Sequence, residues 1–355
     1  MNRRRILTAL GGALPASIAG CLGGGDGRDD AGDGPAEGRS SSDRISRGTP
    51  ADGTGDASSH GPVYVASVKD GRSAALSSLL DRVDPNLDGQ RVAVKANFNS
   101  ADPFPASTHP DTLDGILTHL GGADVVLAER SGMGETRTVL EALGILDLAT
   151  QRGVEVSVLD ALEPSRWSQV RPPESHWRDG FLLPDVFTEA DAVVQTCCLK
   201  THRYGGHFTM SLKNSVGMVA ETDPETGHDY MQELHTAGYQ REKIVEINTA
   251  YEPAFVVMDG VAGFSHGGPA SGKLIEPGVL LASRDRVALD AAGVAILRSF
   301  GTTTEVSQGP VFDQTQIARA VELGLGAPGP QAVELVAVDA DAEPTVDSIR
   351  TQLGE

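Results

Sequence analysis

Short apolar runs alternate with amphipathic stretches from residue 62 to residue 300. The runs, such as residues 91–95 and 124–129, are almost continuous in Val, Ala and Leu, which predicts strands buried on both faces. The stretches between them, such as residues 71–83 and 110–120, repeat apolar residues at helical spacing. This alternation predicts an α/β fold: a mostly parallel, doubly wound sheet with helices on both faces.

The same pattern gives the expected extent of the folded domain. We predict a single domain over residues 61–340 and an acidic tail at residues 341–355. Residues 160–185 are predicted to be irregular, and the polar residues 221–239 are predicted to form a loop with a short helix, a candidate lid. Further strands are predicted at residues 63–68, 154–159, 254–258 and 279–283 and from residue 192 onward, and further helices at residues 135–143, 242–251 and 285–300.

The first sixty residues differ in character, and we expect them to serve export and anchoring. Three arginines at residues 3–5 precede an apolar segment too short to span a bilayer, which is typical of a twin-arginine signal. The segment ends in Ile-Ala-Gly-Cys, which resembles a lipobox and predicts lipidation of Cys21 after removal of residues 1–20. Residues 21–60 have almost no large apolar residue, which predicts a disordered tether. The expected product is a lipoprotein held on the outer face of the cell membrane by its lipid alone.

The charge of the chain limits its partners. The formal net charge is −20, so the surface would repel phosphate backbones, and we expect no nucleic-acid partner. The 29 basic residues include only six lysines. An acidic, lysine-poor composition is typical of salt-adapted proteins and indicates a haloarchaeal source. The sequence does not identify a protein partner.

Lysines and asparagines follow the ends of two predicted strands. Lys95 ends one strand and precedes Asn97, whereas the strand from residue 192 ends in Lys200-Thr201-His202, with Lys213 and Asn214 further on. Because the carboxyl ends of parallel strands meet at one edge of a sheet, we expect a cationic pocket there for a small phosphate or carboxylate. The alternative is that these lysines are ordinary solvated side chains. The predicted ligand-binding residues are Lys95, Asn97, Thr201, Lys213 and Asn214.

Two histidines near predicted strand ends add candidate chemistry. His109 and His202 are predicted to act as an acid–base pair and, with Lys200, to form the catalytic set. Alternatively, the two histidines bind a divalent metal together with Asp259. His109 also precedes Pro110, which makes it a candidate helix cap. The cofactor is therefore unknown, with a divalent metal as one candidate.

The other acidic and thiol side chains have simpler interpretations. Asp285 is predicted to cap a helix, and Asp290, inside that helix, to pair with a nearby arginine or to add a carboxylate to the site. Cys197 and Cys198 are adjacent, so they do not readily bridge each other, and we interpret them as core thiols. Apart from the predicted lipidation site, the chain has only these two cysteines, and an iron–sulfur cluster usually requires four. We therefore expect no iron–sulfur cluster.

The order of these motifs resembles a known family. Val-Lys-Ala-Asn at residues 94–97, Thr-His-Pro at 108–110, Leu-Lys-Thr-His at 199–202 and Ser-Leu-Lys-Asn at 211–214 precede the late pair Asp285 and Asp290. Over residues 62–300 this order is similar to the domain-of-unknown-function 362 family. The chain departs from the family's usual pattern at Ala96 and Cys198, where proline is common, and it lacks the ferredoxin-like cysteine clusters of some relatives. The resemblance implies a common fold and a common site, but it gives no reaction.

Two functions agree with these features. The first is an enzyme that acts on a small anionic substrate, with metal assistance as an option. The second is a non-catalytic lipoprotein that binds a solute or a metal. The histidines distinguish them, because a catalyst requires its acid–base residues for turnover, whereas a binder keeps its lysine pocket without them.

Overall fold

The structure is a computed structural model that describes residues 61–354. The predicted signal, the predicted lipidation site Cys21 and the predicted tether lie outside the described residues. Among residues 61–354, no helix is both long enough and apolar enough to cross a membrane.

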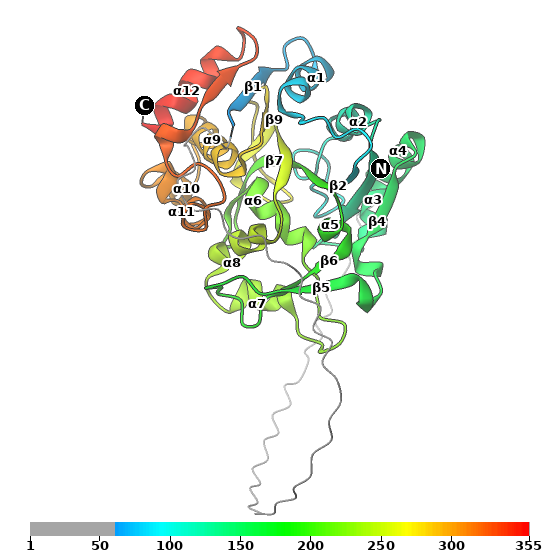
Figure 1. Cartoon of the computed structure of the whole chain (residues 1–355). Helices are drawn as coiled ribbons and strands as arrows, with labels where there is room; N and C mark the ends of the chain where they lie inside the picture. The colour runs from blue at the N-terminus through cyan, green and yellow to red at the C-terminus, as the bar shows by residue number, and fades with distance from the viewer. Residues whose placement is uncertain (1–60, 355) are drawn as a thin grey trace, which may run out of the picture. The chain divides into compact units, whose positions relative to one another are not determined.

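A ten-stranded sheet runs through the described residues, and most of its strands are parallel (Figure 1). Strands β11 and β9 pair antiparallel, as do β1 and β11, whereas the remaining neighbours along the main path pair in parallel. The prediction of a mostly parallel α/β sheet is confirmed. In sheet order the strands are β12 (Leu335–Ala337), β1 (Val63–Ser67), β11 (Val279–Ser283), β9 (Pro253–Gly267), β7 (Ala192–His202), β2 (Arg91–Lys95), β3 (Asp124–Glu129) and β4 (Glu155–Val158). The short strands β8 (His207–Thr209) and β10 (Gly272–Ile275) pair with β7 and β9.

Helices cover both faces of this sheet (Figure 1). One face packs against α1 (Arg72–Val83), α2 (Pro110–His119), α3 (Thr136–Ala142) and α4 (Ile145–Arg152). The other packs against α9 (Arg286–Ser299), α10 (Thr304–Ser307), α11 (Thr315–Glu322) and α12 (Glu343–Leu353). The remaining α-helices are short: α5 (Asp185–Thr188), α6 (Ser211–Asn214), α7 (Tyr230–Thr236) and α8 (Gln240–Glu246).

The beginning of β9, residues 253–258, is apolar because it contributes to both cores. In β9, Phe255 and Val257 join the core under α1 and α2, while Val256 and Met258 join the core under α9 and α12. Successive side chains of a strand point to opposite faces, so a strand segment covered by helices on both sides favours apolar residues at every position.

Two sequence predictions about irregular segments are wrong. The predicted acidic tail contains α12, whose Val346, Ile349 and Leu353 are buried in the core with α9, so the domain extends past residue 340. These three residues form a helical stripe, while the acidic side chains Asp341, Glu343 and Asp347 are exposed. Residues 160–185 are not wholly irregular, because β5 (Trp167–Val170) and β6 (Phe181–Pro184) pair there as a small antiparallel sheet.

The length of β7 positions the polar motif. Lys95, the last residue of β2, pairs with Gln195, so β7 continues well beyond the end of its neighbour. Lys200 and His202 therefore project past the carboxyl edge of β2 and β3. At that edge β7 turns back into β8, where His202 pairs with His207.

Candidate anion-binding site

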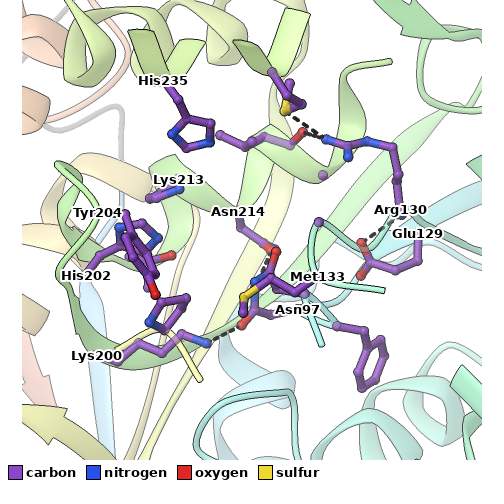
Figure 2. A pocket seen from close by; sticks show the side chains of 18 of the residues that line it. Asn97, Glu129, Arg130, Met133, Lys200, His202, Tyr204, Lys213, Asn214 and His235 are labelled. Carbon is purple, nitrogen blue, oxygen red and sulfur yellow. Dashed lines mark hydrogen bonds between the residues drawn. The ribbon is translucent and has the colours of Figure 1, made fainter. Parts of the chain in front are cut away.

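A cavity of about 770 Å³ lies at the carboxyl ends of β2, β3 and β7. Lys200, His202 and Lys213 lie on one side of it, with Glu129 and Arg130 on the other (Figure 2). Helix α7, in the segment predicted to be a lid, contributes to the wall. The predicted site residues that line the cavity are Lys95, Asn97, Lys200, His202, Lys213 and Asn214.

Strand alternation explains why Thr201 is not one of them. Lys200 and His202 share the cavity side of β7, so the residue between them points to the opposite side. The Thr201 hydroxyl donates to the carbonyls of Phe264 at 3.2 Å and Gly267 at 3.4 Å in β9. Thr201 therefore does not line this cavity, unlike the other predicted ligand-binding residues, and its hydroxyl ties β7 to β9.

Lys200 is buried and is bound by two oxygens of the protein. Its Nζ donates to Asn97 Oδ1 at 2.7 Å and to the carbonyl of Ala106. Thr108 supports this arrangement, because its Oγ1 accepts from the backbone N–H of Asn97 at 2.9 Å. Burial lowers the pKa of Lys200 below its ordinary value. Lys200 therefore fixes the cavity wall through Asn97.

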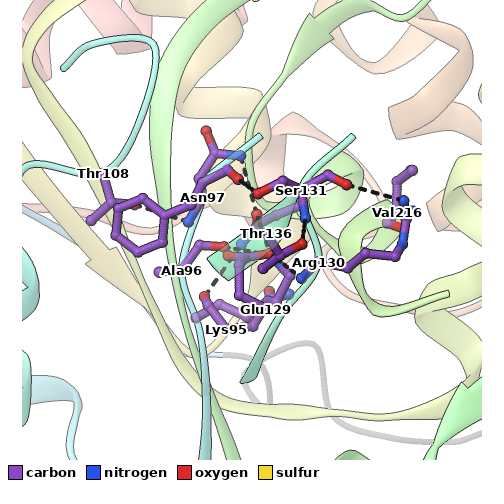
Figure 3. A network of polar contacts seen from close by, with 12 residues as sticks. Lys95, Ala96, Asn97, Thr108, Glu129, Arg130, Ser131, Thr136 and Val216 are labelled. Carbon is purple, nitrogen blue, oxygen red and sulfur yellow. Dashed lines mark hydrogen bonds and ion pairs between the residues drawn. The ribbon is translucent and has the colours of Figure 1, made fainter. Parts of the chain in front are cut away.

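Lys95 forms a buried ion pair with Glu129, at the end of β3 (Figure 3). Lys95 Nζ lies 2.5 Å from Glu129 Oε1, and both side chains are buried. Burial lowers the pKa of Lys95 and raises that of Glu129, and the attraction between the two charges opposes both shifts. Gly217 packs directly on the lysine, since a Cβ at this glycine would lie 2.9 Å from Lys95 Cε. The glycine three residues after Asn214 therefore leaves room for the ion pair.

Arg130 follows Glu129 and forms the far wall, but it is held by backbone carbonyls. Its Nε donates to the carbonyl of Val219 at 2.8 Å, and one terminal nitrogen donates to that of Val216 at 3.0 Å. The sequence interpretation missed both Glu129 and Arg130. The sequence contained a signal for them: Glu129 and Arg130 follow the apolar run of β3, just as Lys95 follows the apolar run of β2.

Lys213 differs from the other cations of the cavity. Its side chain is 9 % exposed, and no residue that the structure describes accepts a hydrogen bond from it or forms an ion pair with it. Burial, followed by the charges of Lys200 and Arg130, lowers the pKa of Lys213 to about 8. The ammonium thus lies in the cavity wall without a counter-charge from the described chain.

Asp290 holds the short helix that carries Lys213. Its two carboxylate oxygens accept from the backbone N–H groups of Ser211 at 2.8 Å and Leu212 at 3.0 Å, at the beginning of α6. Burial raises the pKa of Asp290 to about 7. Asp285, as predicted, caps α9 by accepting from the N–H groups of Val287 and Ala288. Asp290 therefore supports the site through α6, Asp285 holds the beginning of α9, and neither lines the cavity.

His202 is beside Lys213 and remains neutral. The imidazole is 8 % exposed, and burial, together with the charges of Lys213 and Lys200, lowers its pKa to about 2. Its Nδ1 is buried and has no hydrogen-bond partner among the described residues. Gly206 adjoins both side chains, because a Cβ there would lie 3.0 Å from Lys213 Cε and 3.2 Å from His202 Nδ1. His202 can therefore offer a hydrogen bond to a ligand but not a charge.

The predicted partnership of His109 with His202 is wrong. His109 caps α2, accepting at Nδ1 from the N–H of Asp111 at 3.1 Å, and it does not line the cavity. Asp259 is also engaged elsewhere, since its carboxylate is bound by Arg72 and by the hydroxyl of Thr112 at 2.6 Å. Within residues 61–354, no three His, Cys, Asp or Glu side chains are arranged to hold a metal ion, so the predicted set of His109, His202 and Asp259 is not assembled.

The fold and the cavity define an α/β protein with a basic ligand cavity at the carboxyl ends of parallel strands. The chain belongs to the family described as Domain of unknown function (DUF362), whose family model matches residues 92–295. The resemblance inferred from the motif order is thereby confirmed.

Two known proteins are similar to this chain over part of its length. A thylakoid-associated protein of Synechocystis, sll1697, is 26% identical over 214 residues, which are 59% of this chain and 64% of that protein. The chain thus spans just under two thirds of that relative. The lactate racemase apoprotein of Thermoanaerobacterium thermosaccharolyticum aligns with a TM-score of 0.39 and 15% identity, over 64% of this chain and 55% of the other. So distant a structural likeness indicates nothing about the activity of this chain.

Proposed function

We propose that this chain binds a small organic anion, a phosphate or a carboxylate, in the cavity and acts on it as an enzyme. The observation that carries the proposal is Lys213, a buried ammonium in the cavity wall without a partner among the described residues. A buried charge is costly unless an opposite charge or hydrogen bonds compensate it. An anionic ligand would supply that compensation.

The surroundings of Lys213 favour an anion over a cation or a neutral molecule. Four basic side chains line the cavity, Lys95, Arg130, Lys200 and Lys213, against two acidic ones, Glu129 and Glu221. This excess is local, because the whole chain has a formal net charge of −20. The other three cations are bound by protein groups, so Lys213, with His202 beside it, is the expected point of contact.

The same two side chains support turnover. A lysine with a pKa of about 8 exchanges its proton near neutral pH far more readily than an ordinary lysine. The neutral His202 imidazole would orient the ligand through a hydrogen bond. Recovery of each bound anion after incubation, followed by NMR, separates the two functions: a changed molecule indicates an enzyme, and an unchanged one indicates a non-catalytic binding lipoprotein.

Anion binding is expected to weaken as the pH rises through about 8, the pKa of Lys213. Below this pH the ammonium is charged, and the affinity should be constant. Above it, the charged fraction falls about tenfold per pH unit, and the apparent Kd should rise by about the same factor. His202 does not contribute, because it is neutral across this range. Calorimetric titration with methyl phosphate and with acetate between about pH 7 and pH 10 measures the effect.

A matched variant shows whether Lys213 causes this dependence. In Lys213→Met the residual affinity should not vary with pH over the same range. Constant affinity of the unmodified protein up to the highest pH, with its melting temperature unchanged, would contradict the assignment of Lys213 as the anion contact.

We further propose that the chain is exported by the twin-arginine route and anchored through a lipid on Cys21. The arginines at residues 3–5, the short apolar segment and the Ile-Ala-Gly-Cys sequence support this. Cys21→Ser should release the exported protein from the membrane fraction into the medium, because one residue carries the anchor. Cell fractionation with an alkaline wash measures it, with arginine-to-lysine changes at residues 3–5 as the export control. Retention of Cys21→Ser in the washed membranes would show another anchor.

A further inference from the structure

The cavity has exposed apolar side chains as well as cations. The large apolar side chains that remain substantially exposed in the described chain are Met133, Tyr204, Tyr239, Leu274 and Phe300. Two of these, Met133 and Tyr204, line the same cavity, although they come from loops more than seventy positions apart in the sequence. Each is 49% exposed, and both are labelled in Figure 2. Exposed apolar side chains gathered at one concave site are typical of a ligand surface.

Tyr204 is held in place although half of it is exposed. The Arg203 guanidinium lies over its ring at 4.9 Å from the centroid and donates to the Tyr204 hydroxyl at 2.8 Å. The ring also meets His202 edge-on, with 5.7 Å between the centroids. Tyr204 therefore presents a preorganised aromatic surface directly beside the predicted anion contact.

The apolar lining continues along the cavity. Phe98, Val216 and Met231 lie in its wall together with Met133. Methionine is flexible and polarizable and packs well against aromatic rings. The volume of about 770 Å³ lies in the range of about 300–1,000 Å³ that is typical of sites for organic molecules. An inorganic anion at Lys213 alone would leave most of this space, and the accessible parts of Val216, Met231 and Met133, in contact with water.

We propose that the ligand is an organic anion with a flat aromatic body, whose anionic group contacts Lys213 and whose ring packs against Tyr204 and Met133. This inference rests on the proposed function and adds the class of ligand. The charged group alone would need only the lysine, whereas an aromatic body explains why Tyr204 and Met133 are exposed at this cavity. The adenine of a nucleotide and a simple aryl group share the required chemistry, and the experiment separates them.

Matched pairs of probes test the inference by calorimetry on the full chain. The first pair is 1-naphthyl phosphate and methyl phosphate, and the second is adenosine 5′-monophosphate and ribose 5-phosphate. Within a pair the aromatic member should bind about tenfold tighter or more, as is typical of stacking on aromatic side chains. A preference confined to the second pair identifies a nucleotide, and a preference in both identifies aromatic anions generally.

Variants locate the preference. Tyr204→Ala and Met133→Ala should each reduce the aromatic preference, measured as the ratio of the two affinities within a pair, Tyr204→Ala by about fivefold or more. Tyr239→Ala and Leu274→Ala remove apolar groups that are at least as exposed but lie outside the cavity, and they should leave this preference unchanged. All four positions are exposed, so the variants are expected to fold, and melting temperatures check this.

Different results would reject the aromatic ligand and the anion site. The aromatic ligand is rejected if both members of each pair bind with equal affinity, or if neither Tyr204→Ala nor Met133→Ala reduces the preference. Either result would leave the proposed anion site unaffected. If none of the four probes binds, and neither carboxylates nor other phosphates do, the proposed function fails together with it.

Discussion

Replacing Lys213 with methionine is expected to weaken anion binding by about thirtyfold to a few thousandfold, the range seen when one member of a buried charge pair is truncated. The side chain is buried in the cavity wall, and no other unengaged cation of the described chain lines the cavity. Lys95, Lys200 and Arg130 are already bound by protein oxygens, which leaves Lys213 as the cation with no such partner among the described residues. Titration calorimetry with methyl phosphate measures the loss.

The same variant should fold normally. Methionine has a similar length, and removal of an unpaired buried ammonium leaves no opposite charge uncompensated, so the melting temperature should be equal or higher. Lys273→Met, an exposed lysine of β10, is the matched control and should bind as the unmodified protein does. If Lys213→Met binds methyl phosphate with unchanged affinity, the anion contact lies elsewhere.

Replacing Lys95 with methionine is expected to lower the free energy of unfolding by about 3–5 kcal/mol, the usual cost of removing one partner of a buried ion pair. The pair is almost inaccessible to water, with Lys95 and Glu129 each 1% exposed. Without the lysine, the Glu129 carboxylate would be buried without its counter-charge, and it has one oxygen that already lacks a hydrogen-bond partner. Urea unfolding followed by circular dichroism measures the change.

A second variant separates loss of the ion pair from loss of packing. The double variant Lys95→Met/Glu129→Leu removes both charges and should recover most of the lost stability, because buried pairs are often replaced by apolar residues at little cost. If the double variant is as unstable as Lys95→Met, the loss comes from the contacts of Lys95 with Ala96 and Asn214, and the ion pair is not the cause.

Much of the site could be predicted because parallel topology brings strand ends together. Lys95 and Lys200 follow apolar strands that the sequence pattern identifies, and adjacent parallel strands end at the same edge of a sheet. Lys213 and Asn214 are close in sequence to Lys200 and return to the same edge through β8. These four residues line the cavity as expected.

The remaining features depend on orientation and on distant contacts. The face of β7 to which Thr201 points is set by strand alternation, and the cavity side becomes known only from the packing of β9. His109 has the residue type of a catalytic group, but its position before Pro110 makes it a helix cap. Asp290 acts on α6 across 79 positions of sequence, a contact that no local pattern shows. The sequence interpretation treated Glu129 as the end of a strand, because its ion pair forms only when β3 packs beside β2.

The most direct test of the anion site is a crystal structure of the full chain grown with arsenate, whose arsenic atom is located by anomalous scattering. The expected result is an arsenic peak inside the cavity, with an arsenate oxygen about 2.7–3.2 Å from Lys213 Nζ. That peak should be absent from crystals of Lys213→Met. A cavity that contains no arsenate, with Lys213 paired instead to a group of its own chain, would contradict the proposed function.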